Sequence, residues 1–121
     1  MQRLHASFRA AARGVLRAFA LERTFRVMVV FALIMLILVS TVSLSKSERL
    51  VILLITGLKL VLELMNTMVE RLIDLLKPRL STYVRDVKDY MAAAVFVAAL
   101  FAAMIGAVIF VPHVKLLLSQ L

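Results

Sequence analysis

Several common sequence features are missing from this 121-residue chain. Cysteine is absent, so the sequence gives no sign of the redox compartment in which the protein folds. The phosphate-loop pattern GxxxxGKS or GxxxxGKT is absent, so any nucleotide site must be of another kind. Internal repeats and low-complexity tracts are missing as well. Charge is missing from two long runs, residues 27–44 and 90–111, which contain no Asp, Glu, Lys or Arg.

These uncharged runs indicate a membrane protein. Hydrophobic residues make up 64% of the chain and the mean hydropathy is +1.02, more apolar surface than a soluble domain of this length could bury. A bilayer core of about 30 Å needs roughly 20 helical residues. We therefore predict an all-α membrane protein with one domain over 1–121 and spans at about 25–44, 49–76 and 86–112. The first run starts too late for a cleaved signal peptide, so we expect the N-terminus to be retained.

The formal net charge of +8 could indicate a nucleic-acid partner, but the distribution of the charge argues against one. Residues 1–26 hold six arginines and one acid, Glu22. The second turn is also basic, with Lys77, Arg79, Arg85 and Lys88. Cytoplasmic loops of membrane proteins carry such an excess of Lys and Arg. We expect the N-terminus and the second turn to be cytoplasmic, and the first turn and the C-terminus to lie outside.

Residues 3–19 have the pattern of an amphipathic helix. At 100° per residue the apolar side chains fall on one side: Leu4, Phe8, Ala11, Ala12, Val15 and Phe19. The opposite side holds Arg3, Arg9, Arg13 and Arg17. A helix of this kind lies at the membrane interface and is held there by anionic lipid. Direct contact with a lipid substrate or a nucleotide is the alternative.

The third predicted span is rich in small residues at intervals of four: Ala98, Ala102 and Gly106, and Ala99, Ala103 and Ala107. In lipid, small faces allow helix backbones to approach closely. With three spans per chain, this pattern indicates an oligomer.

The middle span is unusual because polar side chains run along it as a stripe. On a helix, Lys59, Asn66, Glu70 and Asp74 lie within about 60° of Glu63, whereas Arg71 lies off this line. Each central charge costs roughly 2.5–3.5 kcal/mol to insert, so the stripe must face protein or water. One interpretation is a polar seam between helices, with Lys59 paired to Glu63. For Glu63, Asn66 and Glu70 together, the unpaired negative charge indicates a metal ion, a proton or a cationic ligand.

The predicted topology places acids and a lysine at the cytoplasmic face, namely Glu22, Glu70, Asp74, Lys88 and Asp89. Carboxylates without His or Cys ligands suit Mg²⁺, which binds through one or two carboxylates and phosphate oxygens. Lys88 would supply a cation for those phosphates. Glu63 lies deeper than Glu70 by about 10 Å and could act as a general base toward a lipid hydroxyl.

Three functions fit this pattern to different degrees. The first is phosphoryl transfer to a membrane lipid. The second is a small proton-coupled transporter that uses the intramembrane Glu63. The third is a non-catalytic assembly subunit. The acids gathered at one face favour the first.

Three segments carry a resemblance to a known family: "LERTFRV", "ELMNTMVERLIDLLKP" and "VKDYMAAAVFVAA". They resemble the prokaryotic diacylglycerol kinases, small membrane lipid kinases that include the undecaprenol kinases, and the resemblance extends over about residues 3–112. It implies a homotrimer in the bacterial inner membrane, with a surface helix and three spans per chain. It also implies phosphorylation of a lipid alcohol by ATP and Mg²⁺ at the cytoplasmic face, in sites between subunits.

The resemblance also implies roles for single residues. Glu63 matches the general base and Asn66 a polar residue of the active site. Glu22 and Glu70 match the carboxylates that bind the metal together with ATP. The positions that match nucleotide contacts are Lys88, Asp89 and, more loosely, Arg3.

The sequence departs from the family pattern in the second turn, where it reads Arg79–Leu80–Ser81 in place of Glu-Tyr-His. The resemblance therefore does not extend to contacts with the nucleotide base in this turn. Thr24, Met28 and Ala93 are smaller departures, and none removes a proposed catalytic residue. The segments "DLLKP" and "VIFVP" favour undecaprenol over diacylglycerol as the substrate.

Overall fold

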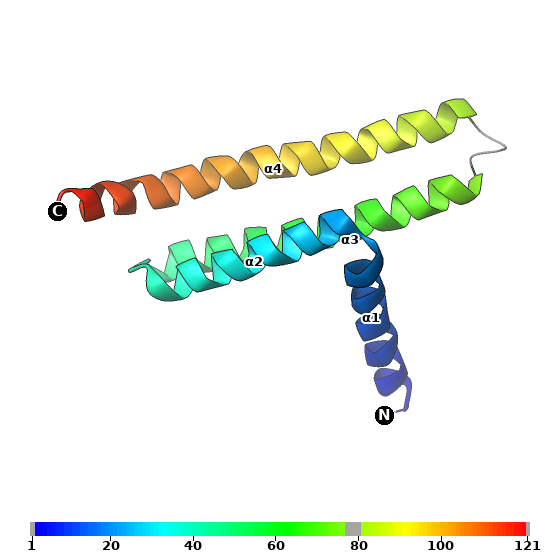
Figure 1. Cartoon of the computed structure of the whole chain (residues 1–121), viewed down its shortest axis with the longest axis horizontal. Coiled ribbons are helices and arrows are strands. Elements are labelled where there is room, and N and C mark those ends of the chain that lie inside the picture. The colour runs from blue at the N-terminus through cyan, green and yellow to red at the C-terminus, as the bar shows by residue number, and fades with distance from the viewer. Residues whose placement is uncertain (1, 77–80, 121) are drawn as a thin grey trace.

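The computed structural model describes residues 2–76 and 81–120, and these residues form four helices (Figure 1). They are α1 (Gln2–Leu21), α2 (Arg23–Thr41), α3 (Lys46–Leu76) and α4 (Ser81–Leu118). The chain runs along α2, returns along α3 and runs back along α4, so consecutive helices are antiparallel (Figure 1). The central helix, α3, contacts both α2 and α4, while α1 contacts α2 and projects away from the other three at a steep angle.

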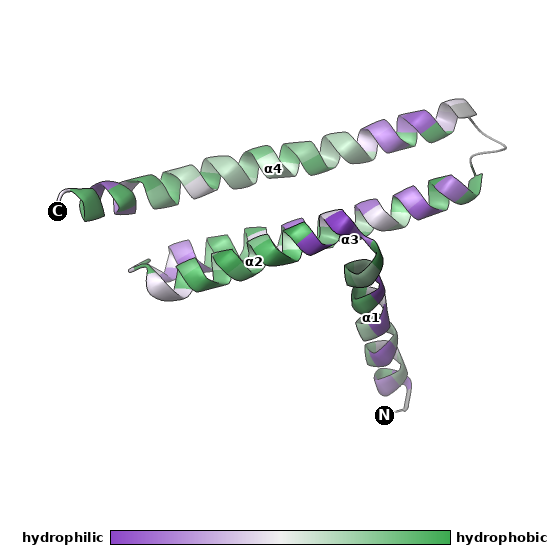
Figure 2. Ribbon diagram, viewed as in Figure 1, coloured by the Kyte–Doolittle hydropathy of each residue, from purple (hydrophilic) through white to green (hydrophobic). Residues whose placement is uncertain are grey.

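Three of these helices are long and apolar enough to cross a membrane: α2, α3 and α4. At 1.5 Å per residue, the 19 residues of α2 extend about 29 Å, which matches the hydrocarbon core of a bilayer. The 31 residues of α3 and the 38 of α4 exceed it. Hydrophilic residues gather where α3 ends and α4 begins, and most of the remaining length of both helices is apolar (Figure 2). The predicted all-helical class is therefore confirmed.

The bundle is packed most tightly at the end that holds the connection from α2 to α3. Val39, Leu44, Ile52 and Ile109 are buried there and form one apolar cluster. Along the rest of the bundle most large apolar side chains are exposed. A bilayer or neighbouring chains would cover such surfaces, because lipid is as apolar as the side chains themselves.

A sharp corner at Glu22 separates α1 from α2. The backbone of Glu22 is extended there, with φ −107° and ψ 114°. The guanidinium of Arg26 donates hydrogen bonds to the carbonyl oxygens of Phe19 and Ala20, at 3.2 and 2.9 Å. These carbonyls end α1 and have no partner within that helix, so Arg26 stabilises the corner.

A capping box starts α3. The Ser45 hydroxyl accepts a hydrogen bond from the Glu48 N–H at 3.3 Å, and the Glu48 carboxylate accepts one from the Ser45 N–H at 2.7 Å. This reciprocal pair satisfies two N–H groups that the first helical turn leaves free. It fixes the residue at which the chain enters α3.

The helix ends differ from the predicted span limits, most clearly in the third span. We expected its helix to open near Asp86 and Asp89, but α4 begins at Ser81, so these acids lie in its second and third turns. The helix also continues past Pro112 to Leu118, although proline removes one backbone donor. The apolar pattern marks the part of a helix that suits lipid, and polar residues extend that helix into water. The predicted break at Pro78 lies outside the described residues.

Candidate active site

The polar stripe lies on α3 and becomes more exposed toward the C-terminal end of that helix. Glu63 is buried, with 4% of its surface exposed. Asn66 and Glu70 are half-buried, and Asp74 is exposed. Within residues 2–76 and 81–120, no hydrogen bond or ion pair is made by the Glu63 side chain. Burying an acid without such a partner is costly unless water, a proton or a ligand meets it, and among the described residues no side-chain oxygen is fully enclosed without a partner.

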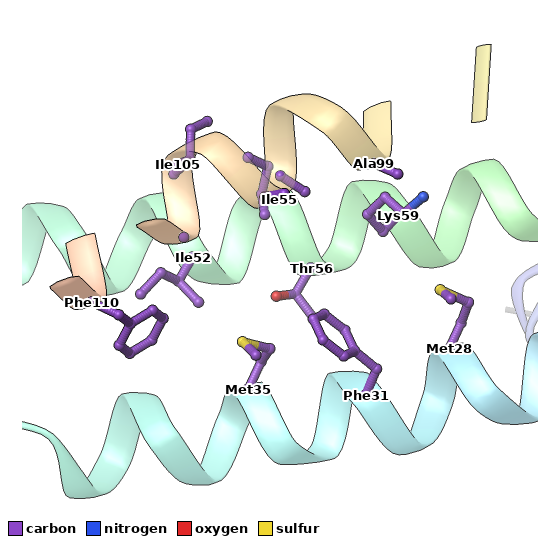
Figure 3. Close-up of a pocket in the computed structure, with 13 residues that line it drawn as sticks. Met28, Phe31, Met35, Ile52, Ile55, Thr56, Lys59, Ala99, Ile105 and Phe110 are labelled. Carbon is purple, nitrogen blue, oxygen red and sulfur yellow. The ribbon is translucent and has the colours of Figure 1, made fainter. Parts of the chain in front are cut away.

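Lys59 does not pair with Glu63, so this part of the sequence interpretation was wrong. Its ammonium group donates instead to the backbone carbonyl of Val95 on α4, at 3.4 Å. Lys59 also lines an apolar cavity of about 320 Å³ between α2, α3 and α4, together with side chains such as Met28 and Phe31 (Figure 3). The seam between helices is therefore present, but it joins α3 to α4 and leaves Glu63 out.

An acidic cleft opens where the α1–α2 corner meets α3. It has a volume of about 650 Å³ and is lined by Glu22, Thr67, Glu70, Arg71, Asp74 and Leu75. The cleft thus brings Glu22 next to Glu70 and Asp74, the C-terminal half of the polar stripe, although Glu22 is far from them in the sequence. The acids of the cleft offer only oxygen atoms as ligands, and oxygen ligands suit a hard cation such as Mg²⁺.

The acids of one chain do not by themselves surround a metal ion. Across the described residues, no three His, Cys, Asp or Glu side chains converge closely enough to hold one. This geometry still fits Mg²⁺, because that ion is usually held by one or two carboxylates, with phosphate oxygens and waters completing its shell.

Arg71 is the residue of this cleft that the sequence reasoning missed. Its Nη2 atom lies 2.7 Å from Oε1 of Glu22 and donates a hydrogen bond within an ion pair. The Arg71 side chain is 57% exposed and that of Glu22 24%. Because 49 residues separate the two in sequence, no local pattern could have paired them. The only available signal was that Arg71 is the one cation between residues 60 and 76.

An apolar groove adjoins the acidic cleft and shares three of its lining residues, Thr67, Arg71 and Leu75. It lies between α1 and α3 and has a volume of about 640 Å³. Its remaining walls are mostly small or aliphatic side chains, such as Gly14 and Leu64. An apolar chain could therefore lie beside the acids.

The other predicted site residues, Glu63 included, do not line the cleft within one chain. Lys88 and Asp89 are exposed on α4 and are not among the residues that line it. Arg3 is exposed in the first turn of α1. Asn66 lies on α3 between Glu63 and Glu70, outside the residues that line the cleft. One chain therefore assembles only part of the predicted set.

Comparison with known proteins supplies the family context. Residues 9–110 match the family described as prokaryotic diacylglycerol kinase. The chain is 35% identical over 112 residues to an undecaprenol kinase of Bacillus subtilis, covering 93% of this chain and 91% of that relative. It is 33% identical over 107 residues to a diacylglycerol kinase of Synechocystis, covering 88% of this chain and 61% of that relative.

Proposed function

We propose a function for this chain from its membership of the prokaryotic diacylglycerol kinase family. In this proposal it transfers the γ-phosphoryl group of ATP to the hydroxyl of a membrane lipid alcohol. The chain is a lipid kinase by this membership, which decides between the kinase and the transporter that the sequence left open. The single observation that supports the proposal best is the position of Glu63. It is a buried, unpaired acid on the same stripe as Glu70, which lines the acidic cleft.

In this proposal Glu63 is the general base. Its carboxylate takes the proton of the lipid hydroxyl while the hydroxyl oxygen bonds to the γ-phosphorus. The bond from that phosphorus to the bridging oxygen breaks, and ADP leaves. A base must lie within hydrogen-bond reach of the proton that it removes, and the place of Glu63 on a helix apolar enough to span a membrane suits a lipid head that stays at the membrane.

Glu22 and Glu70 would hold Mg²⁺ in the acidic cleft, and Asn66 would orient the lipid hydroxyl or a phosphate oxygen. When bound, the metal would offset negative charge on the phosphates during transfer. The donor chemistry of the cleft supports this assignment, since two of its carboxylates can bind while ATP and water supply further oxygens.

The remaining nucleotide contacts would come from a neighbouring chain. Lys88 and Asp89 are exposed on α4 and away from the acidic cleft of their own chain. In a homotrimer, α4 of one chain would pack its small residues closely and bring these two side chains to the acids of the next chain. Arg3 would reach the nucleotide or the lipid head from α1.

Undecaprenol is the favoured lipid and diacylglycerol the next. The likeness to the undecaprenol kinase covers nearly the whole length of both chains, whereas the chain spans only 61% of the diacylglycerol kinase. The groove between α1 and α3 would accept the apolar chain of either lipid. Its continuity with the acidic cleft would place the hydroxyl near the phosphates.

The proposed setting is the bacterial inner membrane, with the N-terminus in the cytoplasm. The arginine-rich N-terminal segment supports this orientation through the excess of positive charge on cytoplasmic segments. In the same proposal α1 is the amphipathic surface helix, with exposed apolar residues such as Leu4 and Phe8 in the interface of an anionic membrane.

A lipid kinase assay with a Glu63→Gln variant tests the central assignment. Purified protein in mixed micelles receives Mg²⁺, labelled ATP and either undecaprenol or diacylglycerol. We expect labelled phosphate on one of the lipids, and a loss of turnover of at least about 100-fold in the variant, because general-base catalysis contributes roughly that much.

Glu48→Gln is the matched control, because it makes the same chemical change in the first turn of α3, well away from Glu63, and glutamine also serves in a capping box. Its turnover should equal that of the unmodified protein. Full activity in Glu63→Gln would show that another group is the base. Phosphorylation of neither lipid by the unmodified protein would refute both substrate assignments.

A further inference from the structure

Arg71 lies outside every motif position that defines the family resemblance, yet it forms an ion pair with Glu22. That pair joins α3 to Glu22 at the α1–α2 corner, with 2.7 Å between Nη2 and Oε1. Arg71 is also the only cation among the described residues that line the acidic cleft. Its role in the reaction therefore needs an explanation of its own.

The ion pair conflicts with the proposed role of Glu22. A divalent cation on this carboxylate would lie next to the guanidinium, and the two positive charges would repel at this short range. Binding of the metal therefore weakens the contact between Arg71 and Glu22. The side chain of Arg71 is 57% exposed, and it borders a cleft of about 650 Å³, so it has room to turn.

We propose that Arg71 is a phosphate-binding residue that pairs with Glu22 only while the site is empty. When the metal–nucleotide enters, Arg71 leaves Glu22 and donates to the phosphate oxygens. This inference rests on the proposed lipid kinase function. A guanidinium suits such an exchange, because its planar fork binds a carboxylate and a phosphate equally well in geometry.

Two binding measurements on the full-length protein in detergent test this exchange. The first is calorimetric binding of a non-hydrolysable Mg·ATP analogue. In Arg71→Gln we expect the affinity to fall about tenfold or more, because the variant loses charge-assisted hydrogen bonds to the phosphates. The second is binding of Mn²⁺ alone, followed by electron paramagnetic resonance. Here we expect the affinity of Arg71→Gln to rise about threefold or more, because a competing cation has been removed.

These opposite changes separate the proposal from a merely structural tie. If Arg71 only fastens α3 to the α1–α2 corner, the variant should lose both affinities and unfold at a lower temperature. Arg23→Gln is the matched control, because it removes an arginine next to Glu22 that makes no ion pair within the described residues. It should change neither affinity. Arg71→Lys keeps a positive charge opposite Glu22 but lacks the planar guanidinium. This variant should therefore fold normally and bind the analogue more weakly than the unmodified protein.

The results also distinguish this proposal from the function on which it rests. If the unmodified protein phosphorylates lipid and Arg71→Gln or Arg71→Lys binds the analogue normally, the lipid kinase assignment stands and the role of Arg71 is refuted. If the unmodified protein neither binds the analogue nor phosphorylates lipid, the proposed function falls and the role of Arg71 falls with it.

Discussion

At the scale of single residues, the charged side chains of α3 differ in what surrounds them. Arg71 and Asp74 are exposed at the C-terminal end of the helix, whereas Glu63 is buried and Lys59 lines an apolar cavity. The cost of a charge rises with its depth in an apolar medium. A buried charged residue that makes no hydrogen bond or ion pair therefore needs a functional explanation. Glu63 is such a residue, whereas Lys59 donates a hydrogen bond to Val95.

Replacing Lys59 by methionine tests this distinction. The hydrogen bond from Lys59 to Val95 is long, at 3.4 Å, and such a bond contributes about 1 kcal/mol at most. Removing the charge from an apolar setting should gain roughly 2.5 kcal/mol or more. We expect Lys59→Met to unfold at the same or a higher temperature in detergent, with turnover within about twofold of the unmodified protein.

Methionine is the suitable replacement because it keeps most of the volume that lines the cavity. The contrary result would be a folded Lys59→Met protein with little turnover. Lys59 would then have to act on the reaction itself, for instance through the nearby carboxylate of Glu63.

The sequence predicted which of these residues share one face of a helix, but it did not predict which residues they contact on other helices. Rotation by 100° per residue places Glu63, Asn66 and Glu70 on one side of any helix, and α3 holds all three. The partners of Lys59 and Arg71 were missed, because they depend on where α4 and the α1–α2 corner pack. Those positions arise from long-range packing that no local spacing encodes.

At the scale of helices, the connection between α2 and α3 depends on the capping box of Ser45 and Glu48. Ser45→Ala should destabilise the protein by about 1 kcal/mol, because the first turn of α3 loses a hydrogen-bond acceptor. Thermal unfolding in detergent measures the effect. Turnover at low temperature should not change, since the acidic cleft lies at the opposite end of α3.

Ser47→Ala provides the comparison, because Ser47 is an exposed serine in the same turn with no side-chain hydrogen bond among the described residues. If both variants unfold at the same temperature, the capping box contributes nothing measurable. The buried cluster around Ile52 would then account for the stability of this end.

Helix limits were not predictable from apolar composition alone. The uncharged run from 27 to 44 predicts a first span that ends at 44, but α2 ends at Thr41, where the hydroxyls of Ser40 and Thr41 donate to the backbone carbonyl of Ile37. In α4 the charged first turns are helical although they are polar, because helical geometry does not require lipid. Hydropathy therefore locates the apolar centre of each helix and not its ends.

At the scale of the whole molecule, one chain brings together only part of the proposed site. Glu22 and Glu70 line the acidic cleft, while Lys88 and Asp89 lie on another helix and point to no described partner within the chain. Exposed apolar side chains along α2–α4 leave wide surfaces for other chains. Both observations support an assembly in which acids and lysine come from different copies.

Mixing two inactive variants tests whether the site is shared between chains. Glu63→Gln and Lys88→Met should each abolish turnover alone, because each removes one part of every site. In mixed oligomers, however, a site that takes Glu63 from one chain and Lys88 from its neighbour can be intact. Random mixing in equal amounts should then restore about a quarter of the original turnover, since each of the two contributions is correct half the time.

The measurement is lipid phosphorylation after the two variants are unfolded together and refolded in detergent. Each variant refolded separately and mixed afterwards is the control, and it should stay inactive if chains do not exchange. If co-refolded oligomers also stay inactive while unmodified chains recover full turnover, Glu63 and Lys88 must act within the same chain. Lys88 would then have to reach the cleft by a rearrangement of α4 against α3, whose contact is the most extensive helix pairing in the described chain.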